Sequence, residues 1–257
     1  MGRVVSICNQ KGGVGKTTTA INLGSSLASL GRKVLIIDLD SQANATSGLG
    51  IDKRSADASV YEVLLGQEPL ASAVKSTAVN NLSIVPSKPA LAGVEVELVG
   101  VEQREFRLRE AVGSVRESFD FILIDTPPSL GLLTINSLAA SDTVLIPLQC
   151  EYYAMEGLSQ LLETVHLVQE NLNPALKIEG ILLTMADYRT KLTEQVIGEV
   201  RNFFGVKVFK TIVPRAIRLS EAPGFGKSIT EYDPTSVGAV SYINLAKEVS
   251  DAKERFG

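Results

Sequence analysis

Short runs of apolar residues, rich in β-branched side chains, alternate along the chain with longer stretches in which apolar residues recur every three or four positions. The short runs predict strands at residues 4–8, 34–38, 82–85, 121–125, 143–147, 178–184 and 208–213. Most of these runs are apolar throughout instead of alternating with polar residues. This is typical of strands that are covered on both faces of a parallel sheet.

The longer stretches predict helices at residues 17–30, 104–118, 156–171, 192–204 and 237–255. Alternating strands and helices require right-handed crossovers, so they predict an α/β fold: a doubly wound, mostly parallel sheet with helices on both faces. No internal repeat, low-complexity tract or long linker interrupts the pattern. We therefore expect residues 1–257 to form a single domain.

The composition is 45% hydrophobic and 21% charged, which matches an ordinary soluble globular protein and argues against disorder. No apolar run is long enough for a transmembrane helix, and the N-terminus lacks a signal-peptide stretch, so we expect a cytoplasmic protein. Cys8 and Cys150 are too few and too far apart for a disulfide framework or a zinc site. The single histidine, His166, excludes a multi-histidine metal centre.

The formal net charge is −4, but the charge is unevenly distributed. Residues 188–227 carry eight basic and three acidic side chains, which gives this segment a net charge of +5 and leaves −9 on the rest of the chain. We call residues 188–227 the basic segment. Such an asymmetry indicates an anionic partner that contacts one part of the surface.

A glycine-rich loop directly follows the first predicted strand and opens the first predicted helix. Residues 10–18 read Gln-Lys-Gly-Gly-Val-Gly-Lys-Thr-Thr. Glycines let successive backbone N–H groups turn toward an anion, and the helix N-terminus adds a partial positive charge. The lysine would reach the β- and γ-phosphates of a nucleotide, and the first threonine hydroxyl would bind Mg²⁺. We therefore expect a nucleotide to be bound by Gly12, Gly13, Val14, Gly15, Lys16, Thr17 and Thr18.

This loop departs from the strict P-loop pattern because Gln10 stands where glycine is usual. Residues 11–18 instead resemble the deviant Walker A motif of the ParA/MinD superfamily of P-loop ATPases. The resemblance implies that Lys11 also binds nucleotide, by crossing a dimer interface to the phosphates held by the partner subunit.

Two predicted strands end in carboxylates at the edge where α/β folds bind ligands. Asp38 and Asp40 end the second strand, and alternation puts both on the same side. This segment resembles the superfamily's switch I, in which the position of Asp40 orients the attacking water. Asp125 ends another apolar strand, which resembles Walker B and implies that Asp125 holds Mg²⁺. The loop after Asp125, stiffened by two prolines, resembles switch II.

Phosphoryl transfer needs mainly positioning and charge neutralisation, so this set of residues suffices without a histidine or a covalent nucleophile. We expect a Mg²⁺-dependent ATPase. Lys16 and a partner-supplied Lys11 would stabilise charge on the γ-phosphoryl group, and Asp40 would hold the water in line.

The resemblance extends over essentially the whole chain and is closest to chromosomal ParA proteins, also called Soj. Residues 40–50 resemble their Asp-Pro-Gln-Gly-Asn-Ala-Thr segment, with Ser41 and Ala43 in place of the proline and glycine. Residues 149–157 and 213–223 match two further family segments. The second match implies that Pro214, together with Met185, contacts adenine.

ParA proteins form an ATP-bound sandwich homodimer that binds double-stranded DNA without sequence preference, and a ParB-type partner stimulates hydrolysis and release. The resemblance therefore implies these partners, and a location on the nucleoid, for this chain. Arg189 and Arg218, both in the basic segment, match the DNA-contacting positions of relatives. Phosphate neutralisation of this kind is salt-dependent and insensitive to base sequence.

Three other functions share parts of this pattern. A MinD-like, membrane-associated ATPase would need a basic amphipathic C-terminal helix. In the last predicted helix, however, Glu248, Asp251 and Glu254 balance the basic side chains, so we expect no membrane anchor. A nitrogenase-type iron–sulfur reductase would need two cysteines near the switch regions, and an ATP-dependent biosynthetic ligase would need a substrate pocket. The choice between chromosomal and plasmid segregation stays open.

Overall fold

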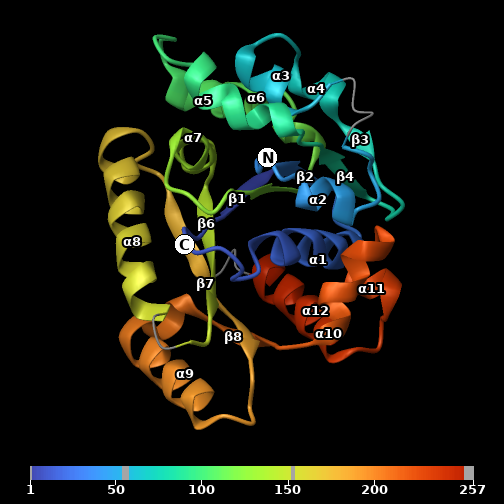
Figure 1. The fold of residues 1–257 in the computed structure, drawn as a ribbon, viewed down its shortest axis with the longest axis vertical. Helices are drawn as coiled ribbons and strands as arrows, with labels where there is room; N and C mark the ends of the chain where they lie inside the picture. The colour runs from blue at the N-terminus through green and yellow to red at the C-terminus, as the bar shows by residue number, and fades with distance from the viewer. Residues whose placement is uncertain (1, 54–57, 152–153, 252–257) are drawn as a thin grey trace.

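An eight-stranded sheet forms the centre of the protein. The computed structural model describes residues 2–53, 58–151 and 154–251 (Figure 1). The strand order is β3-β4-β2-β5-β1-β6-β7-β8, and every neighbouring pair is parallel except β3 and β4. The strands are β1 (Arg3–Ile7), β2 (Val34–Asp38), β3 (Lys75–Ser76), β4 (Leu82–Val85), β5 (Phe121–Asp125), β6 (Thr143–Gln149), β7 (Lys177–Ala186) and β8 (Val208–Pro214). The predicted fold class is confirmed.

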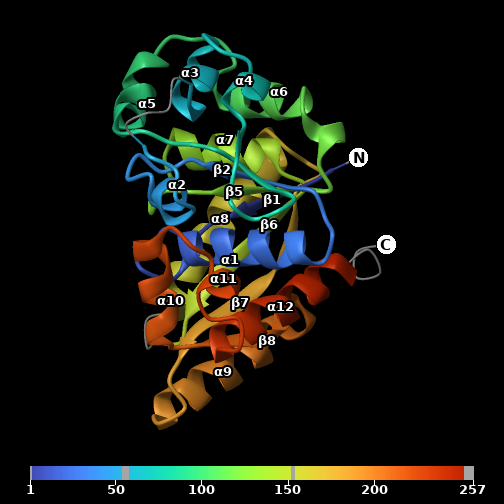
Figure 2. The same cartoon turned by 90° about the vertical axis from the view of Figure 1, so that its right-hand side faces the viewer.

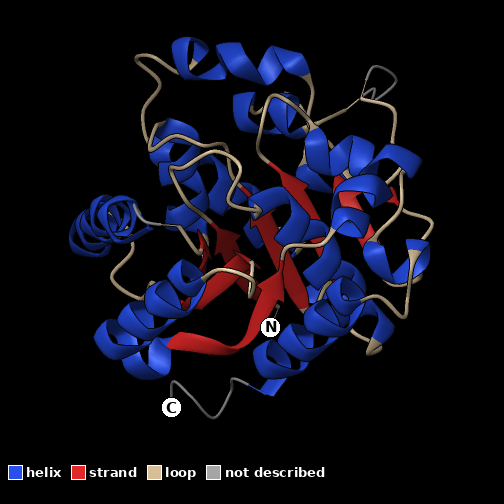
Figure 3. Ribbon diagram, turned by 60° about the horizontal axis from the view of Figure 1, so that its bottom comes forward, coloured by secondary structure: helices blue, strands red, loops and turns tan. Residues whose placement is uncertain are grey.

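Helices cover both faces of this sheet (Figures 2 and 3). On one face lie α1 (Lys16–Ser29) and α12 (Val237–Ser250), with three short helices: α2 (Asn44–Gly48), α10 (Ile217–Glu221) and α11 (Ile229–Tyr232). The other face carries α3 (Val60–Leu65), α4 (Leu70–Ala73), α5 (Val94–Glu97), α6 (Arg107–Gly113), α7 (Leu132–Ala140), α8 (Ala154–Asn171) and α9 (Lys191–Phe204). Short 3-10 turns complete the chain: η1 (Pro89–Gly93), η2 (Arg104–Phe106), η3 (Arg116–Ser118), η4 (Gly205–Lys207) and η5 (Ala222–Phe225). Within the described ranges, no helix has the length and apolar character needed to cross a membrane.

The continuous apolar runs are explained by burial on both faces. Every residue of β2 and β5 is buried. Successive side chains of a strand point to opposite faces, so Val34 and Ile36 join the core under α1 and α12, whereas Leu35 and Ile37 join the core under α3 and α6. Strands in which apolar and polar residues alternate are instead typical of a sheet with one face exposed to solvent.

One predicted helix is not continuous in the structure. The predicted helix at residues 104–118 is divided into η2, α6 and η3. At the junction of η2 and α6, the buried Asn136 side chain of α7 takes the place of a helical hydrogen bond between residues 104 and 108. Its Nδ2 donates to the backbone oxygen of Arg104, and its Oδ1 accepts from the backbone N–H of Leu108. The C-terminal helix ends at Ser250, and the predicted extension to residue 255 lies largely outside the described residues. β3, α7 and the short helices between residues 44 and 97 were not predicted.

Candidate functional site

The register of the central strands brings the predicted site residues together. In the β2–β5 ladder Asp38 pairs with Asp125, and in the neighbouring β1–β5 ladder Ile7 pairs with Asp125. The loop that follows β1 therefore begins beside two carboxylates. This is the carboxyl edge of the parallel sheet, where open α/β folds form their ligand crevice.

The glycine-rich loop leaves the N-terminus of α1 open to an anion. Gly15 precedes the helix at a φ of 92°, a left-handed conformation that favours glycine. No side chain caps α1, so its first backbone N–H groups have no side-chain acceptor. Beside them is a cavity of about 320 Å³, the phosphate-loop cavity, lined by Gly12, Gly13, Gly15, Lys16, Thr17, Thr18, Asp40, Gln42, Asn44, Pro128 and Met185. The predicted phosphate-binding residues thus converge on one space, with the exception of Lys11 and the buried Val14.

The ammonium group of Lys16 lies inside the loop. The residue is only 7% exposed, and its Nζ donates to the backbone oxygen of Lys11 at 3.1 Å. Burial lowers the pKa of Lys16, and the negative charges of Asp125 and Asp40 oppose that shift. A buried ammonium with one carbonyl partner still has two N–H donors available for a phosphate group.

Asp125 is a buried carboxylate without a hydrogen-bond partner among the residues that the structure describes. Burial raises its pKa well above the ordinary value, and the neighbouring Asp38 adds to the rise. The Thr17 hydroxyl and Lys16 act in the opposite direction, although Thr17 makes no hydrogen bond of standard geometry with Asp125. A buried, unpartnered carboxylate is costly unless a cation compensates it. Its oxygens and the Thr17 hydroxyl are ligands that Mg²⁺ accepts while keeping several waters, so this donor set fits the metal.

Asp38 and Asp40 differ in what they contact. The carboxylate of Asp38 accepts hydrogen bonds from the N–H and hydroxyl of Thr46, at 2.8 and 2.6 Å, and from the N–H of Asp40. Burial raises the pKa of Asp38 to about 6. Asp40 is 9% exposed and lines the phosphate-loop cavity, and its Oδ1 accepts from the N–H of Gln42. Asp38 therefore fixes the loop into α2, while Asp40 faces the space for a ligand.

Lys11 points away from the phosphate-loop cavity of its own chain. Its Nζ donates to Glu151 Oε2 at 2.9 Å, and its side chain is 42% exposed. The preceding Gln10 donates to Gln160 Oε1 at 2.6 Å. The departing residue, Gln10, and the neighbouring Lys11 are therefore held by residues just before or within α8. These contacts could not be predicted from the sequence, because Glu151 and Gln160 lie 140 and 150 positions away from their partners along the chain.

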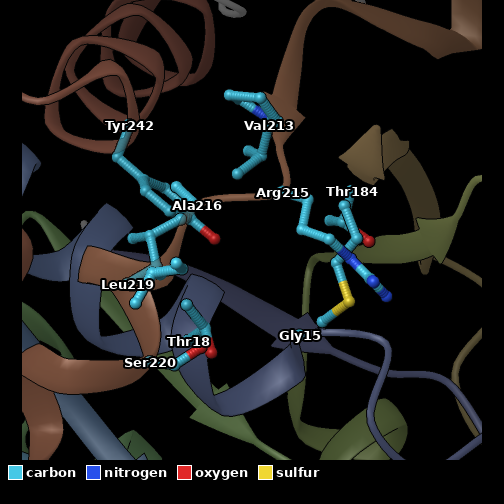
Figure 4. A pocket seen from close by; sticks show the side chains of 12 residues that line it. Gly15, Thr18, Thr184, Val213, Arg215, Ala216, Leu219, Ser220 and Tyr242 are labelled. Carbon is cyan, nitrogen blue, oxygen red and sulfur yellow. The ribbon is translucent and has the colours of Figure 1, made fainter. Parts of the chain in front are cut away.

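A second cavity of about 330 Å³ adjoins the first and has mostly apolar walls (Figure 4). The two share Gly15, Thr18 and Met185, and Pro214 lines the second. An apolar slot next to a phosphate loop suits a flat nucleobase. Met185 and Pro214, the residues predicted to contact adenine, both line this second cavity.

Several residues of this second cavity were not predicted. Figure 4 shows Tyr242 and Leu219 on one side of the pocket and Thr184 and Arg215 on the other. The Tyr242 hydroxyl lies 3.2 Å from that of Thr19 in α1. Tyr242 lies on the buried face of α12, and this face also borders the second cavity.

Arg189 and Arg218 lie on the surface, each in an ion pair. Arg189 is 85% exposed and donates to both carboxylate oxygens of Asp187, at 2.8 and 2.6 Å. Arg218, in α10, is 57% exposed, donates to Glu221 at 3.0 Å and lies 3.7 Å from Asp233. The basic segment therefore presents these two charges already paired with acids.

Comparisons with known proteins agree with this geometry. A family model described as an AAA domain matches residues 2–178. Sporulation initiation inhibitor protein Soj of Bacillus subtilis (strain 168) is 57% identical, over 97% of this chain and 99% of that protein. Chromosome partitioning protein ParA of Myxococcus xanthus (strain DK1622) is 55% identical, over 97% of this chain and 88% of that protein.

Two solved structures share the fold. Cobyrinic acid a,c-diamide synthase from Mycobacterium smegmatis, with bound ADP and magnesium, has a TM-score of 0.87 and 37% identity, covering 99% of this chain and 96% of that one. The septum site-determining protein MinD from Pyrococcus horikoshii, complexed with Mg-ADP, has a TM-score of 0.81 and 27% identity, covering 98% of each chain. Identity to Soj and ParA is considerably higher than to either of these proteins. The chain belongs to the ParA/Soj family of chromosome-partitioning ATPases, which use ATP and Mg²⁺.

Proposed function

We propose that residues 1–257 form one ATPase domain that dimerises on ATP and then binds double-stranded DNA without sequence preference. A ParB-type protein stimulates hydrolysis and so releases the DNA. In this proposal the protein works in the cytoplasm on the nucleoid. Its similarity to Soj and ParA over nearly the whole chain supports the proposal.

Nucleotide binding divides between the two adjoining cavities. The open N-terminus of α1 and Lys16 bind the phosphates, with Gly12, Gly13 and Gly15 supplying close backbone approach. Asp125 and Thr17 hold Mg²⁺, which neutralises phosphate charge when bound. Met185 and Pro214 contact the adenine base through the apolar cavity.

Hydrolysis requires a water in line with the γ-phosphate and charge stabilisation on the transferred group. Asp40 is the carboxylate that faces the phosphate-loop cavity, and we assign to it the orientation of that water. Lys11, which points out of its own site, acts in the partner's site. For this it must leave Glu151, and because that ion pair is largely exposed, breaking it costs little.

The basic segment supplies the DNA contacts through Arg189 and Arg218. A single chain with a net charge of −4 offers only one such face, and a dimer offers two. Dimerisation therefore multiplies the number of simultaneous phosphate contacts without any change within the basic segment.

The observation that carries the proposal is the buried pair of complementary groups, Lys16 and Asp125, beside an uncapped helix N-terminus. The experiment is a DNA-binding titration with Mg-ATP, with Mg-ADP and without nucleotide, at two salt concentrations. We expect tight binding only with ATP, falling steeply with added salt. Equal binding in all three states would contradict the proposal.

Two of the rival functions considered from the sequence are the iron–sulfur reductase and the MinD-like membrane-associated ATPase, and neither is favoured by the residues of this chain. Cys8 and Cys150 are both buried in the core under α8 and α9, and burial raises the pKa of each thiol to about 11. This is a poor environment for cluster-ligating thiolates. A MinD-like membrane association would be revealed by vesicle binding that depends on ATP, and we expect none.

A further inference from the structure

The Asp187–Arg189 ion pair occupies the guanidinium group that the proposed function assigns to DNA. Asp187 Oδ1 accepts from Arg189 Nε at 2.8 Å, and Oδ2 accepts from a terminal nitrogen at 2.6 Å. The pairing lowers the pKa of Asp187 to about 2, and nearby Arg215 contributes to that shift. Asp187 is thus ionised at every pH at which DNA binding would be measured.

A DNA phosphate would use the same donors. The planar guanidinium presents its N–H groups as a fork that matches a carboxylate and a phosphate in the same way. Arg189 cannot offer the same two-pronged contact to both partners at once. Binding of a phosphate in this geometry therefore requires that the carboxylate be displaced.

Asp187 is the fixed member of the pair. Its backbone oxygen accepts from the N–H of Thr190 at 3.1 Å and from the Thr190 hydroxyl at 3.1 Å, and Thr190 is the N-cap of α9. On its other side, the backbone oxygen of Ala186 accepts from the N–H of Arg215. The Arg189 side chain is exposed to solvent and its ion pair is with Asp187, so the guanidinium can move to a phosphate while the backbone of Asp187 stays in place.

We infer that Asp187 sets the DNA affinity of this protein by competing with DNA phosphate for Arg189. The inference rests on the proposed DNA-binding function and adds a residue whose removal strengthens binding. An alternative role for the same carboxylate, holding Arg189 in the pose that DNA requires, predicts the opposite effect. The sign of the change therefore separates the two roles.

The substitution Asp187→Asn isolates the competing charge. Asp187 Oδ1 also accepts from the backbone N–H of Arg189, as in an Asx turn, and an asparagine oxygen can keep that bond. The variant should retain the loop and lose the two-pronged ion pair. Titrating a duplex of random sequence with Mg-ATP present, we expect an affinity about three- to fivefold higher than wild type. The gain should shrink at higher salt, because ions screen an exposed pair.

Glu194→Gln is the matched control. Glu194 is exposed and lies in the first turn of α9. Its substitution by glutamine removes the same unit of negative charge as Asp187→Asn. No ion pair is found for it in the described part of the chain. If Glu194→Gln strengthens DNA binding as much as Asp187→Asn, the effect is one of net charge and the inference fails.

A double-mutant cycle completes the test. In an Arg189→Ala background, Asp187→Asn should raise the DNA affinity by no more than Glu194→Gln does, because no guanidinium remains to be released. An unchanged or weaker affinity of Asp187→Asn, with wild type binding DNA normally, overturns this inference alone. Failure of both wild type and Asp187→Asn to bind DNA with ATP overturns the proposed function as well.

Discussion

The two charged regions of the molecule are built in opposite ways. At the carboxyl edge of β1, β2 and β5, Lys16 and Asp125 are buried, with shifted pKa values, and Asp125 has no hydrogen-bond partner among the described residues. In and beside the basic segment, Arg189 and Arg218 are exposed and already paired with acids. One region holds ionisable groups out of water, including a carboxylate without a hydrogen-bond partner among the described residues, and the other holds paired charges in water.

This difference determines how each region binds. Burying charged groups costs free energy that only a complementary ligand restores, so the phosphate site is specific and strongly dependent on individual residues. Exposed ion pairs contribute little and are screened by salt, so the basic segment can exchange its acids for DNA phosphates at small cost. Substitutions at the two regions should therefore differ in size and in salt dependence.

The largest effect is expected for Asp40→Ala in the buried region. The variant should still bind Mg-ATP, because Lys16 and the loop are intact, but should hydrolyse it at least about 100-fold more slowly, because the water is no longer held in line. The rate of ATP turnover measures the loss of hydrolysis. The trapped nucleotide should keep the protein dimeric on size-exclusion chromatography, and a monomer in excess ATP, with a dimeric wild type, would refute the role of Asp40.

A smaller, uniform effect is expected for Arg218→Ala in the basic segment. DNA affinity should fall about equally for unrelated sequences, and the slope of log affinity against log salt should flatten by about one or two. Arg189→Ala should behave in the same way. ATP affinity and dimerisation serve as controls and should not change, since neither arginine lines the phosphate-loop cavity. Sequence-dependent loss of binding would be evidence for base contacts instead.

The smallest effect concerns a close approach between the basic segment and the chain just after α2. Gly226, at the end of η5, has a φ of 64°, and a Cβ there would lie 2.8 Å from the Cα of Gly50, just after α2. Gly226→Ala should lower stability by about 2 kcal/mol, seen as a reduced thermal midpoint. Gly224→Ala is the matched control, because a Cβ at Gly224 meets nothing within 4 Å. Equal thermal midpoints for the two variants would show that the backbone at Gly50 and Gly226 moves apart at little cost in stability.

The sequence predicted the parts of the molecule that depend on local pattern. Continuous apolar runs located seven of the eight strands, because burial on both faces leaves a signal within five residues. The glycine-rich loop was recognised because its chemistry demands particular residues at fixed spacing. β3 is two residues long and too short to show any period.

Features that depend on contacts between distant segments could not be predicted. Lys11 meets Glu151 across 140 positions, and Gln10 meets Gln160 across 150. Arg215 and Tyr242 line the second cavity because β8 and α12 converge beside α1. A pattern of apolar spacing identifies a buried face but does not say which cavity that face borders.

The most direct test of the link between the two regions is the DNA affinity of Lys16→Ala in saturating Mg-ATP. Lys16 lies in the buried site, where its Nζ donates to the backbone oxygen of Lys11, and it is not part of the basic segment. We predict that this variant binds Mg-ATP poorly and that its DNA affinity falls to that of wild type without nucleotide. A Lys16→Ala protein that binds DNA as tightly as ATP-bound wild type would show that DNA binding does not depend on the phosphate site.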